Sequence, residues 1–313
     1  MFRNWVLEIR YLNVMTHVPV LLDEVISYLK IKPGGVYIDA TLGFGGHAQK
    51  ILEIIGPKGI MLGVDIDQEA IDEAEKKLSR IGKNFRIFCD NFINIKNLVY
   101  QQNIRCVDGI LFDLGTNIHQ IKSGARGFSF LVDGPLDMRL GRKPVQKNTQ
   151  FRIKELTAAE ILNKWSEEKL ADIFWDSGEI KARKIARAIV LRRREKKFER
   201  TGELVGLIKK IKRGYTKIHP ATKVFQALRI AVNDEIKNLK IALSDSLDLL
   251  APRGRLVVIS FHSGEDRVVK NFFKEQKDLK ILTKKPVTPS EEEIIKNPHS
   301  RSARLRAAEK IAD

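Results

Sequence analysis

The stretch Asp39–Ile51, DATLGFGGHAQKI, places three glycines between an apolar run and a segment with helical spacing. Glycine adopts backbone conformations that other residues avoid, and it lets a ligand or another segment approach the backbone closely. Gly43, Gly45 and Ala48 fit the pattern G-x-G-x-x-A, which is typical of the first turn of a nucleotide-binding βαβ unit. Alone, this pattern suits NAD, FAD or S-adenosylmethionine equally, and a tight turn without a ligand is the alternative.

Around this stretch, the first third of the chain alternates between apolar runs and amphipathic segments. The predicted strands are 35–41, 60–67, 85–91 and 108–115, and the predicted helices are 46–55 and 68–81. Continuous apolar strands that alternate with helices favour a doubly wound parallel α/β sheet of the Rossmann-like kind.

The strand pattern then stops, and residues 121–218 contain segments with helical spacing and basic faces. A long helix is predicted over 221–250, followed by a turn at 251–254 and a further strand at 255–263. We therefore expect three parts. They are a Rossmann-like domain from residues 16–120 and 219–313, a helical insertion at 121–218 for substrate recognition, and an N-terminal extension at 1–15. For the extension, a start at Met15 and a leader helix are both open.

Charge and composition indicate the class of partner. The chain of 313 residues contains 56 Lys and Arg against 39 Asp and Glu, a formal net charge of +17. Such an excess favours a polyanion, usually nucleic acid, over the alternative of a generally basic proteome. Its two cysteines show no metal-ligand spacing, and no apolar stretch is long enough to span a membrane. We expect a cytoplasmic protein that uses no metal and makes no membrane contact.

Acidic residues end or follow each of the first four predicted strands: Asp39, Asp65, Asp90 and Asp113. The carboxyl ends of parallel strands meet at one edge of a sheet, where such folds bind ligands. Asp65 is placed to accept from ribose hydroxyls, and Asp39 to pair with an ammonium group. These acids suit a methyl-donor site better than a hydride-transfer site, because S-adenosylmethionine presents an amino acid where a dinucleotide presents pyrophosphate.

Several longer stretches together resemble one family, from Thr16 almost to the end of the chain. The matching stretches are THVPVLLDEV (16–25), YIDATLGFGGHA (37–48), RGFSFLVDGPLDMRL (126–140), HPATKVFQALRIAVNDE (219–235), RGRLVVISFHSGED (253–266) and NPHSRSARLR (297–306). The chain is identified by them as similar to the bacterial 16S rRNA cytosine-N4 methyltransferases of the MraW type. That resemblance implies a class I methyltransferase fold with a helical insertion, S-adenosylmethionine as donor, and a cytidine in the decoding region of the small ribosomal subunit as acceptor.

The resemblance also implies site residues. The donor-binding positions of the family fall on Gly45, Gly46, His47, Asp65, Phe92, Asp113 and Gln120. Within that set, His47 is expected to donate to the carboxylate of the donor and Phe92 to pack on its adenine. Candidate substrate-binding residues are Arg126, Phe128, Phe130 and Arg139. For one of the two phenylalanines, packing in the core is the preferred alternative to stacking on a base.

Three positions depart from the family pattern on the expected substrate side. Residues 116–119 replace a pair of serines, Gly264 replaces a leucine, and Gly141 replaces an acid. These departures leave a second hypothesis open, namely an RNA-binding protein that keeps the donor fold without catalysis. Whether the substrate is naked rRNA or an assembled subunit, and whether the protein forms a homodimer, also stay open.

The chemistry of methyl transfer selects the candidate catalytic residues. The N4 amine of cytosine is a poor nucleophile, so an acceptor beside it would help by orienting the amine and taking up charge. Asp113 is the first candidate, with pure donor binding as the alternative, and His262 is the weaker candidate, for which a structural function is preferred. We expect the basic segment 181–200 to meet phosphates unless it is a plain solvated face. The arginines Arg301, Arg304 and Arg306 are expected to fold onto the core or onto RNA.

Overall fold

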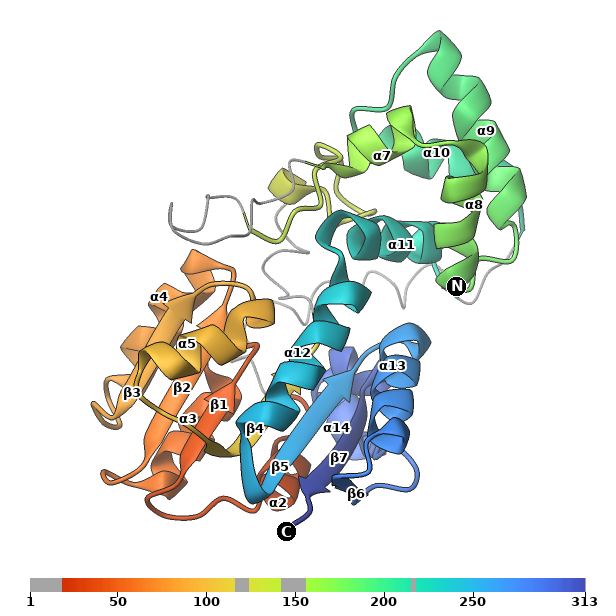
Figure 1. Cartoon of the computed structure of the whole chain (residues 1–313). Helices are drawn as coiled ribbons and strands as arrows, with labels where there is room; N and C mark the ends of the chain where they lie inside the picture. Colours follow the sequence, from red (N-terminus) through yellow and green to blue (C-terminus); the bar gives the residue numbers. More distant parts are fainter. Residues whose placement is uncertain (1–18, 116–123, 142–155, 215–217, 313) are drawn as a thin grey trace. The chain divides into compact units, whose positions relative to one another are not determined.

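The computed structural model describes residues 19–115, 124–141, 156–214 and 218–312. The chain divides into two compact units (Figure 1). One unit, called here the sheet unit, contains residues 1–114 and 242–313, and the other, called the helical unit, contains residues 115–241.

The sheet unit is built on one seven-stranded sheet with the order β3-β2-β1-β4-β5-β7-β6. Its strands are β1 Val36–Asp39, β2 Ile60–Asp65, β3 Phe85–Cys89, β4 Val107–Asp113, β5 Leu250–Ser260, β6 Leu279–Ile281 and β7 Arg304–Lys310. The first five strands of this order pair in parallel, as the alternation of apolar runs and helices predicts. The Rossmann-like α/β class is confirmed, and β7, which was not predicted as a strand, is antiparallel to both of its neighbours.

Helices flank this sheet. They are α2 Leu22–Leu29, α3 Gly46–Ile55, α4 Gln68–Leu78, α5 Ile95–Gln101, α13 Ser263–Glu275 and α14 Glu291–Lys296, with short 3₁₀ turns η2 Phe92–Asn94 and η4 Pro298–Ser302. Helix α3 has the bounds that its apolar spacing predicts, and it buries one face that includes Ile51, Leu52 and Ile55. Among the described residues, no helix has both the length and the apolar character that a membrane span needs.

Two predictions on the approach to β5 are wrong. The single helix expected over 221–250 is two helices, α11 Thr222–Asn233 and α12 Glu235–Leu249, because Asp234 between them is left-handed with φ 50°. Aspartate tolerates this conformation better than most residues, and no glycine or proline marks the break. The turn expected at 251–254 lies inside β5 as an irregularity where the pairing with β4 shifts, and Arg253 has φ 64° there.

Strand β7, which contains two of the C-terminal arginines, was not predicted from the sequence. The strand alternates charged residues with Leu305 and Ala307, both fully buried, so it lacks the long apolar run of the other strands. Arg306 is buried and its Nε donates to Oδ1 of Asp266 at 2.6 Å. The segment therefore folds onto the core of the sheet unit, one of the two alternatives open from the sequence, while Arg301 is exposed.

The helical unit has its own apolar core. Its helices are α7 Ala158–Lys164, α8 Glu167–Asp176, α9 Ala182–Glu195, α10 Thr201–Ile211 and α11, with the 3₁₀ turn η3 Gly124–Arg126 before them. The core contains fully buried side chains from each of these five helices of the described residues, for example Ile161, Phe174, Ile185, Leu204 and Leu228. The helical unit is therefore held together by an apolar core of its own.

Candidate functional site

The carboxyl ends of the strands bring three acidic side chains to one edge of the sheet. Asp39, Asp65 and Asp113 are the last residues of β1, β2 and β4, and Asp90 directly follows β3. Because β2, β1 and β4 are neighbours, these acids lie along the same edge. The chain changes direction between β1 and β4, which is the topological switch point where open α/β sheets bind ligands.

Beside this edge, the glycine-rich loop has two requirements that only glycine satisfies well. Gly43 and Gly45 have positive φ, 51° and 70°, and a Cβ on Gly45 would lie 3.1 Å from Cβ of Ala74 in α4. A Cβ on Gly46 would lie 2.5 Å from Cγ of Pro19. The loop is thus both left-handed and tightly packed, which keeps the first N–H groups of α3 close to the strand edge.

Asp65 ties this loop to β2. Its Oδ2 accepts the N–H of Gly43 at 2.7 Å, and its Oδ1 accepts the N–H of Asp67 at 2.9 Å. Burial raises the pKa of Asp65, and the backbone N–H groups of Asp67 and Gly43 act against that rise. A carboxylate has about four acceptor positions, so two bonds to the backbone leave capacity for two hydroxyl donors.

Asp113 is the acid at the switch point with unsatisfied bonding capacity. Its Oδ1 is buried and has no hydrogen-bond partner among the described residues, although the whole side chain is 20% exposed. Burial raises the pKa of Asp113 to about 8, and the negative charges of Asp39 and Glu265 add to the rise. A buried oxygen without a donor is costly unless a ligand completes it.

His47 is buried beside the glycine-rich loop and contacts two segments of the sheet unit. Its Nε2 lies 2.9 Å from the carbonyl oxygen of Val20, so this nitrogen donates to the backbone. Its Nδ1 lies 3.7 Å from Oδ2 of Asp113. His47 is 5% exposed, and it therefore connects the segment before α2 with the acid at the switch point. Any contact with a ligand carboxylate would have to come from the helix N–H groups or from Nδ1.

Asp39 is the most deeply buried of the strand-end acids, at 1% exposure. Its Oδ1 accepts the N–H of Thr41 at 3.2 Å. Burial raises its pKa to about 7, against the hydrogen bond from Thr41. Thr41, which sequence reasoning missed, also accepts the N–H of Asp113 through Oγ1 at 2.6 Å. Thr41 lies two residues after Asp39, the last residue of β1, and this position is the only local signal in the sequence that could have identified it.

On the β3 side, Phe92 lies in η2 and its ring meets Phe112 edge to face, with centroids 5.7 Å apart. The turn before it is ordered by Asp90, whose Oδ1 accepts from the N–H of Asn91 and from Nδ2 of Asn94 at 2.8 Å. Phe92 is half-buried, so part of its surface stays open for an aromatic ligand.

His262, the weaker catalytic candidate, caps a helix. Its Nδ1 accepts the N–H groups of Gly264 and Glu265 at the start of α13, at 3.2 and 3.3 Å. Oε2 of Glu265 in turn accepts the N–H of His262, and Oε1 lies 3.1 Å from Nε2. This reciprocal cap gives the residue a structural function, while its buried Nε2 has no hydrogen-bond partner among the described residues.

The four candidate substrate residues lie in the helical unit, and most are engaged in its structure. Phe128 is in the core, and buried Arg126 donates to the carbonyl of Leu140 at 3.1 Å. Arg139 makes a two-point ion pair with Asp137 at 2.6 and 3.0 Å. Phe130 is half-buried and its ring stacks on His219, with centroids 4.5 Å apart. Gln120 and the segment 116–119 lie outside the described residues.

Comparison with known proteins gives one consistent result. The model of the MraW methylase family matches residues 14–311. A Ribosomal RNA small subunit methyltransferase H from Carboxydothermus hydrogenoformans is 43% identical over 318 residues, which cover 95% of this chain and 98% of that relative. The protein of the same name from Dictyoglomus thermophilum is 45% identical over 298 residues, with 94% and 96% of the two chains covered.

Proposed function

Because the chain belongs to the MraW methylase family, we propose that it transfers a methyl group from S-adenosylmethionine to the N4 amine of a cytidine in 16S rRNA. Its relatives bear the name of small-subunit rRNA methyltransferases. The choice of the cytosine N4 atom rests on the resemblance of the motifs and on the acid at the switch point. An rRNA substrate implies action in the cytoplasm, on the small subunit or its RNA.

The observation that carries the proposal is the buried Oδ1 of Asp113, which has no hydrogen-bond partner among the described residues. It lies at the end of β4, where a ligand at the switch point would reach it. A neighbouring amine hydrogen would satisfy this oxygen and remove the cost of leaving it unpaired.

The residues at the edge of the sheet fit the donor. S-adenosylmethionine, when bound, supplies a methyl group made electrophilic by its sulfonium sulfur. The turn at Gly45 and Gly46 would bring backbone N–H groups to the amino acid part, and Asp65 would accept from the ribose hydroxyls. Phe92 would pack against the adenine through its exposed surface.

Asp113 would then act on the acceptor base. Its Oδ1 would accept one N4 hydrogen, turn the nitrogen lone pair toward the methyl group and stabilise the positive charge that grows on the amine. The proton leaves after the new C–N bond has formed, and a carboxylate with a raised pKa is suited to receive it. His47, 3.7 Å from the other oxygen, would position this carboxylate.

The proposed function is tested by identifying the product. The purified protein is incubated with S-adenosylmethionine and with small subunits that lack the modification, and the nucleosides are analysed by mass spectrometry. N4-methylcytidine is the expected product. A ring-methylated or ribose-methylated nucleoside would disprove the N4 assignment, and donor binding without any product would favour the alternative of an RNA-binding protein.

A first prediction concerns Asp65. We expect Asp65→Ala to weaken donor binding about 10- to 150-fold, which corresponds to the ~1.5–3 kcal/mol of a hydrogen bond to a charged group. The variant also loses the bond from Asp65 to the N–H of Gly43, so the loop is released as well. Titration calorimetry with S-adenosylmethionine measures the change, and Asp72→Ala, at an exposed position of α4, is the control. Wild-type affinity in a folded Asp65→Ala protein would remove this residue from the site.

A further inference from the structure

Helix α9 of the helical unit contains six basic side chains and a single acid. One face of the helix, formed by Ala182, Ile185, Ala186 and Ile189, is buried in the core. At 3.6 residues per turn, Arg183, Arg187 and Arg194 lie within a narrow arc on the opposite face, with Lys184 beside them. We call these four residues the arginine stripe. The only apolar side chain on this arc is Leu191, which is 51% exposed.

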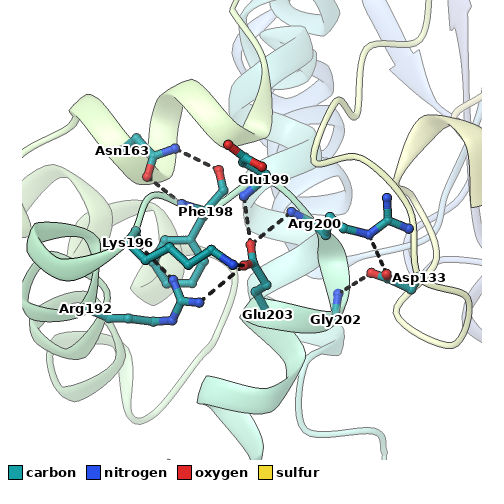
Figure 2. Close-up of polar contacts among 9 residues, drawn as sticks. All are labelled: Asp133, Asn163, Arg192, Lys196, Phe198, Glu199, Arg200, Gly202 and Glu203. Atoms are coloured by element: carbon teal, nitrogen blue, oxygen red, sulfur yellow. Dashed lines mark hydrogen bonds and ion pairs between the residues drawn. The ribbon is translucent and has the colours of Figure 1, made fainter.

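The cations near the stripe make contacts within the helical unit. Figure 2 shows these contacts for Arg192, Lys196 and Arg200. The guanidinium of Arg192 lies over the ring of Phe198, 4.4 Å from its centroid, and donates to the carbonyl of Lys196 at 2.9 Å. Arg193 donates to the carbonyls of Leu162 and Trp165 at 2.8 and 2.6 Å. These contacts fix the C-terminal turn of α9 against the rest of the unit.

The connection from α9 to α10 is held in the same way (Figure 2). Glu203 accepts the N–H of Glu199 at 2.9 Å and pairs with Nζ of Lys196 at 3.1 Å. The hydrogen bond from Glu199 is the largest cause that lowers the pKa of Glu203 to about 2. Nε of Arg200 pairs with Asp133 at 2.6 Å. The end of the stripe at Arg194 is therefore attached to an ordered segment.

The stripe itself differs from these cations. All four of its side chains are exposed, and none makes a hydrogen bond or ion pair within the described part of the chain. At the N-terminal end of α9 its charges are also placed against the local electrostatics of the helix, whereas Arg194 lies in the last turn, where the dipole favours a cation. Arg183 and Lys184 lie at the positive end of the helix dipole, no acid occupies the first turn, and Arg183 and Arg187 are like charges at i,i+4.

Several other helices place acids in their first turn, whereas α3, α5 and α11, like α9, have none there. Helix α8 has Glu167 and Glu168 in its first turn, and α14 has three glutamates there. Departures from such local rules are expected where a function compensates for them. A bound polyanion would compensate here, because its negative charges would meet both the stripe and the positive end of the dipole.

We propose that the arginine stripe binds the phosphate backbone of the rRNA substrate. This inference rests on the proposed function and names the surface by which the helical unit would hold its RNA. Arginine presents a planar fork that matches phosphate oxygens in pairs, and three of the four residues are arginines. An acidic protein partner fits less well, since the centre of a protein interface is usually apolar and Leu191 is the only apolar side chain on the same arc of α9.

The test compares two triple variants with equal loss of charge. In the stripe variant, Arg183→Gln, Arg187→Gln and Arg194→Gln are combined. The control combines Lys58→Gln, Lys83→Gln and Lys277→Gln, three exposed lysines that precede β2, β3 and β6 at the edge of the sheet opposite the strand-end acids. The probe is an unmodified transcript of the small-subunit rRNA, and its affinity is measured from low to high salt.

We expect the stripe variant to bind this transcript roughly 10²-fold more weakly at about 0.1 M salt. The slope of log affinity against log salt should be shallower by about 2, since each lost phosphate contact removes about 0.7 from it. The control variant should keep the wild-type slope, and both variants should bind S-adenosylmethionine as the wild type does. Arg193→Gln should instead lower the melting temperature of the helical unit and leave the salt slope unchanged.

Equal affinity and equal slope in the stripe and control variants would overturn the proposal. A loss confined to assembled subunits, with normal binding to the protein-free transcript, would also overturn it and indicate an acidic protein partner. The proposed function is tested separately, by whether N4-methylcytidine forms. If the wild type forms N4-methylcytidine while the stripe variant matches the control, only the stripe fails. If no product forms but salt-dependent binding requires the stripe, only the methylation assignment fails.

Discussion

Asp113→Asn is expected to slow methyl transfer by about 10²–10⁴-fold at saturating donor and saturating small subunits. The substitution keeps the shape of the side chain and one acceptor oxygen, but it removes the negative charge that would stabilise the developing positive charge on N4. The buried Oδ1 lies at the switch point with its bonding capacity unused by any described residue, which makes it the available group for that amine. Single-turnover transfer of the methyl group measures the step directly.

Asp108→Asn is the matched control for this experiment. Asp108 lies in the same strand at its other end, where Oδ2 accepts the N–H of Val36 at 2.9 Å. The control should transfer methyl groups at the wild-type rate. If Asp113→Asn binds the donor weakly but transfers normally once saturated, Asp113 only holds the donor, and the catalytic assignment is wrong.

Thermal unfolding shows whether the Asp113→Asn protein is intact. The pKa of Asp113 is raised in the folded state, so the folded protein holds a proton that the unfolded chain has lost between about pH 4 and pH 8. Stability therefore falls as pH rises through this range, by linkage. Asparagine does not ionise, so the Asp113→Asn variant lacks this loss of stability. At neutral pH it should melt at the same temperature as the wild type or higher.

Donor affinity is expected to rise about 10²-fold between pH 6 and pH 8.5. The pKa of Asp113 is about 8 and that of Asp39 about 7, both raised first by burial, so both carboxyls are largely protonated at pH 6. Asp113 would lose its proton when the donor binds, because its carboxylate is stabilised by the sulfonium and ammonium charges. A single required ionisation changes affinity about tenfold per pH unit below the pKa.

Calorimetry in two buffers with different ionisation enthalpies measures the protons released. Release should approach one proton or more per donor near pH 6.5 and should fall toward zero above pH 9. Asp113→Asn should flatten the profile above pH 7, while the dependence due to Asp39 remains at lower pH. An affinity that stays constant from pH 6 to pH 9 would contradict the linkage of donor binding to these acids.

Much of the sheet unit was predictable because its signals are local. Continuous apolar runs mark strands that are buried on both faces, and the bounds of α3 follow from its apolar spacing and the glycines before it. The strand-end acids were found in the same way, since parallel strands place their carboxyl ends at one edge whatever surrounds them. The sequence therefore determined the fold class and the edge of the sheet at which the acids meet.

The sequence could not predict features that depend on partners far along the chain. β7 is a strand because it pairs with β5 and β6, and its Arg306 is buried because Asp266 in α13 meets it. The direction of His47 depends on the carbonyl of Val20, and the break at Asp234 has no glycine or proline to announce it. Each of these depends on tertiary contacts that local propensity does not contain.

The basic segment 181–200 shows most clearly what the sequence determined and what only the tertiary structure decided. By itself, the sequence determined that this segment is strongly cationic, and it left a phosphate-binding surface with a plain solvated face as the alternative. The helix predicted over the whole segment ends at Glu195. Only the tertiary structure decided which cations are engaged, since the partners of Arg192, Arg193 and Arg200 come from Phe198, from α7 and from Asp133. Charge is a property of the residue, whereas an unpaired charge depends on what the fold places beside it.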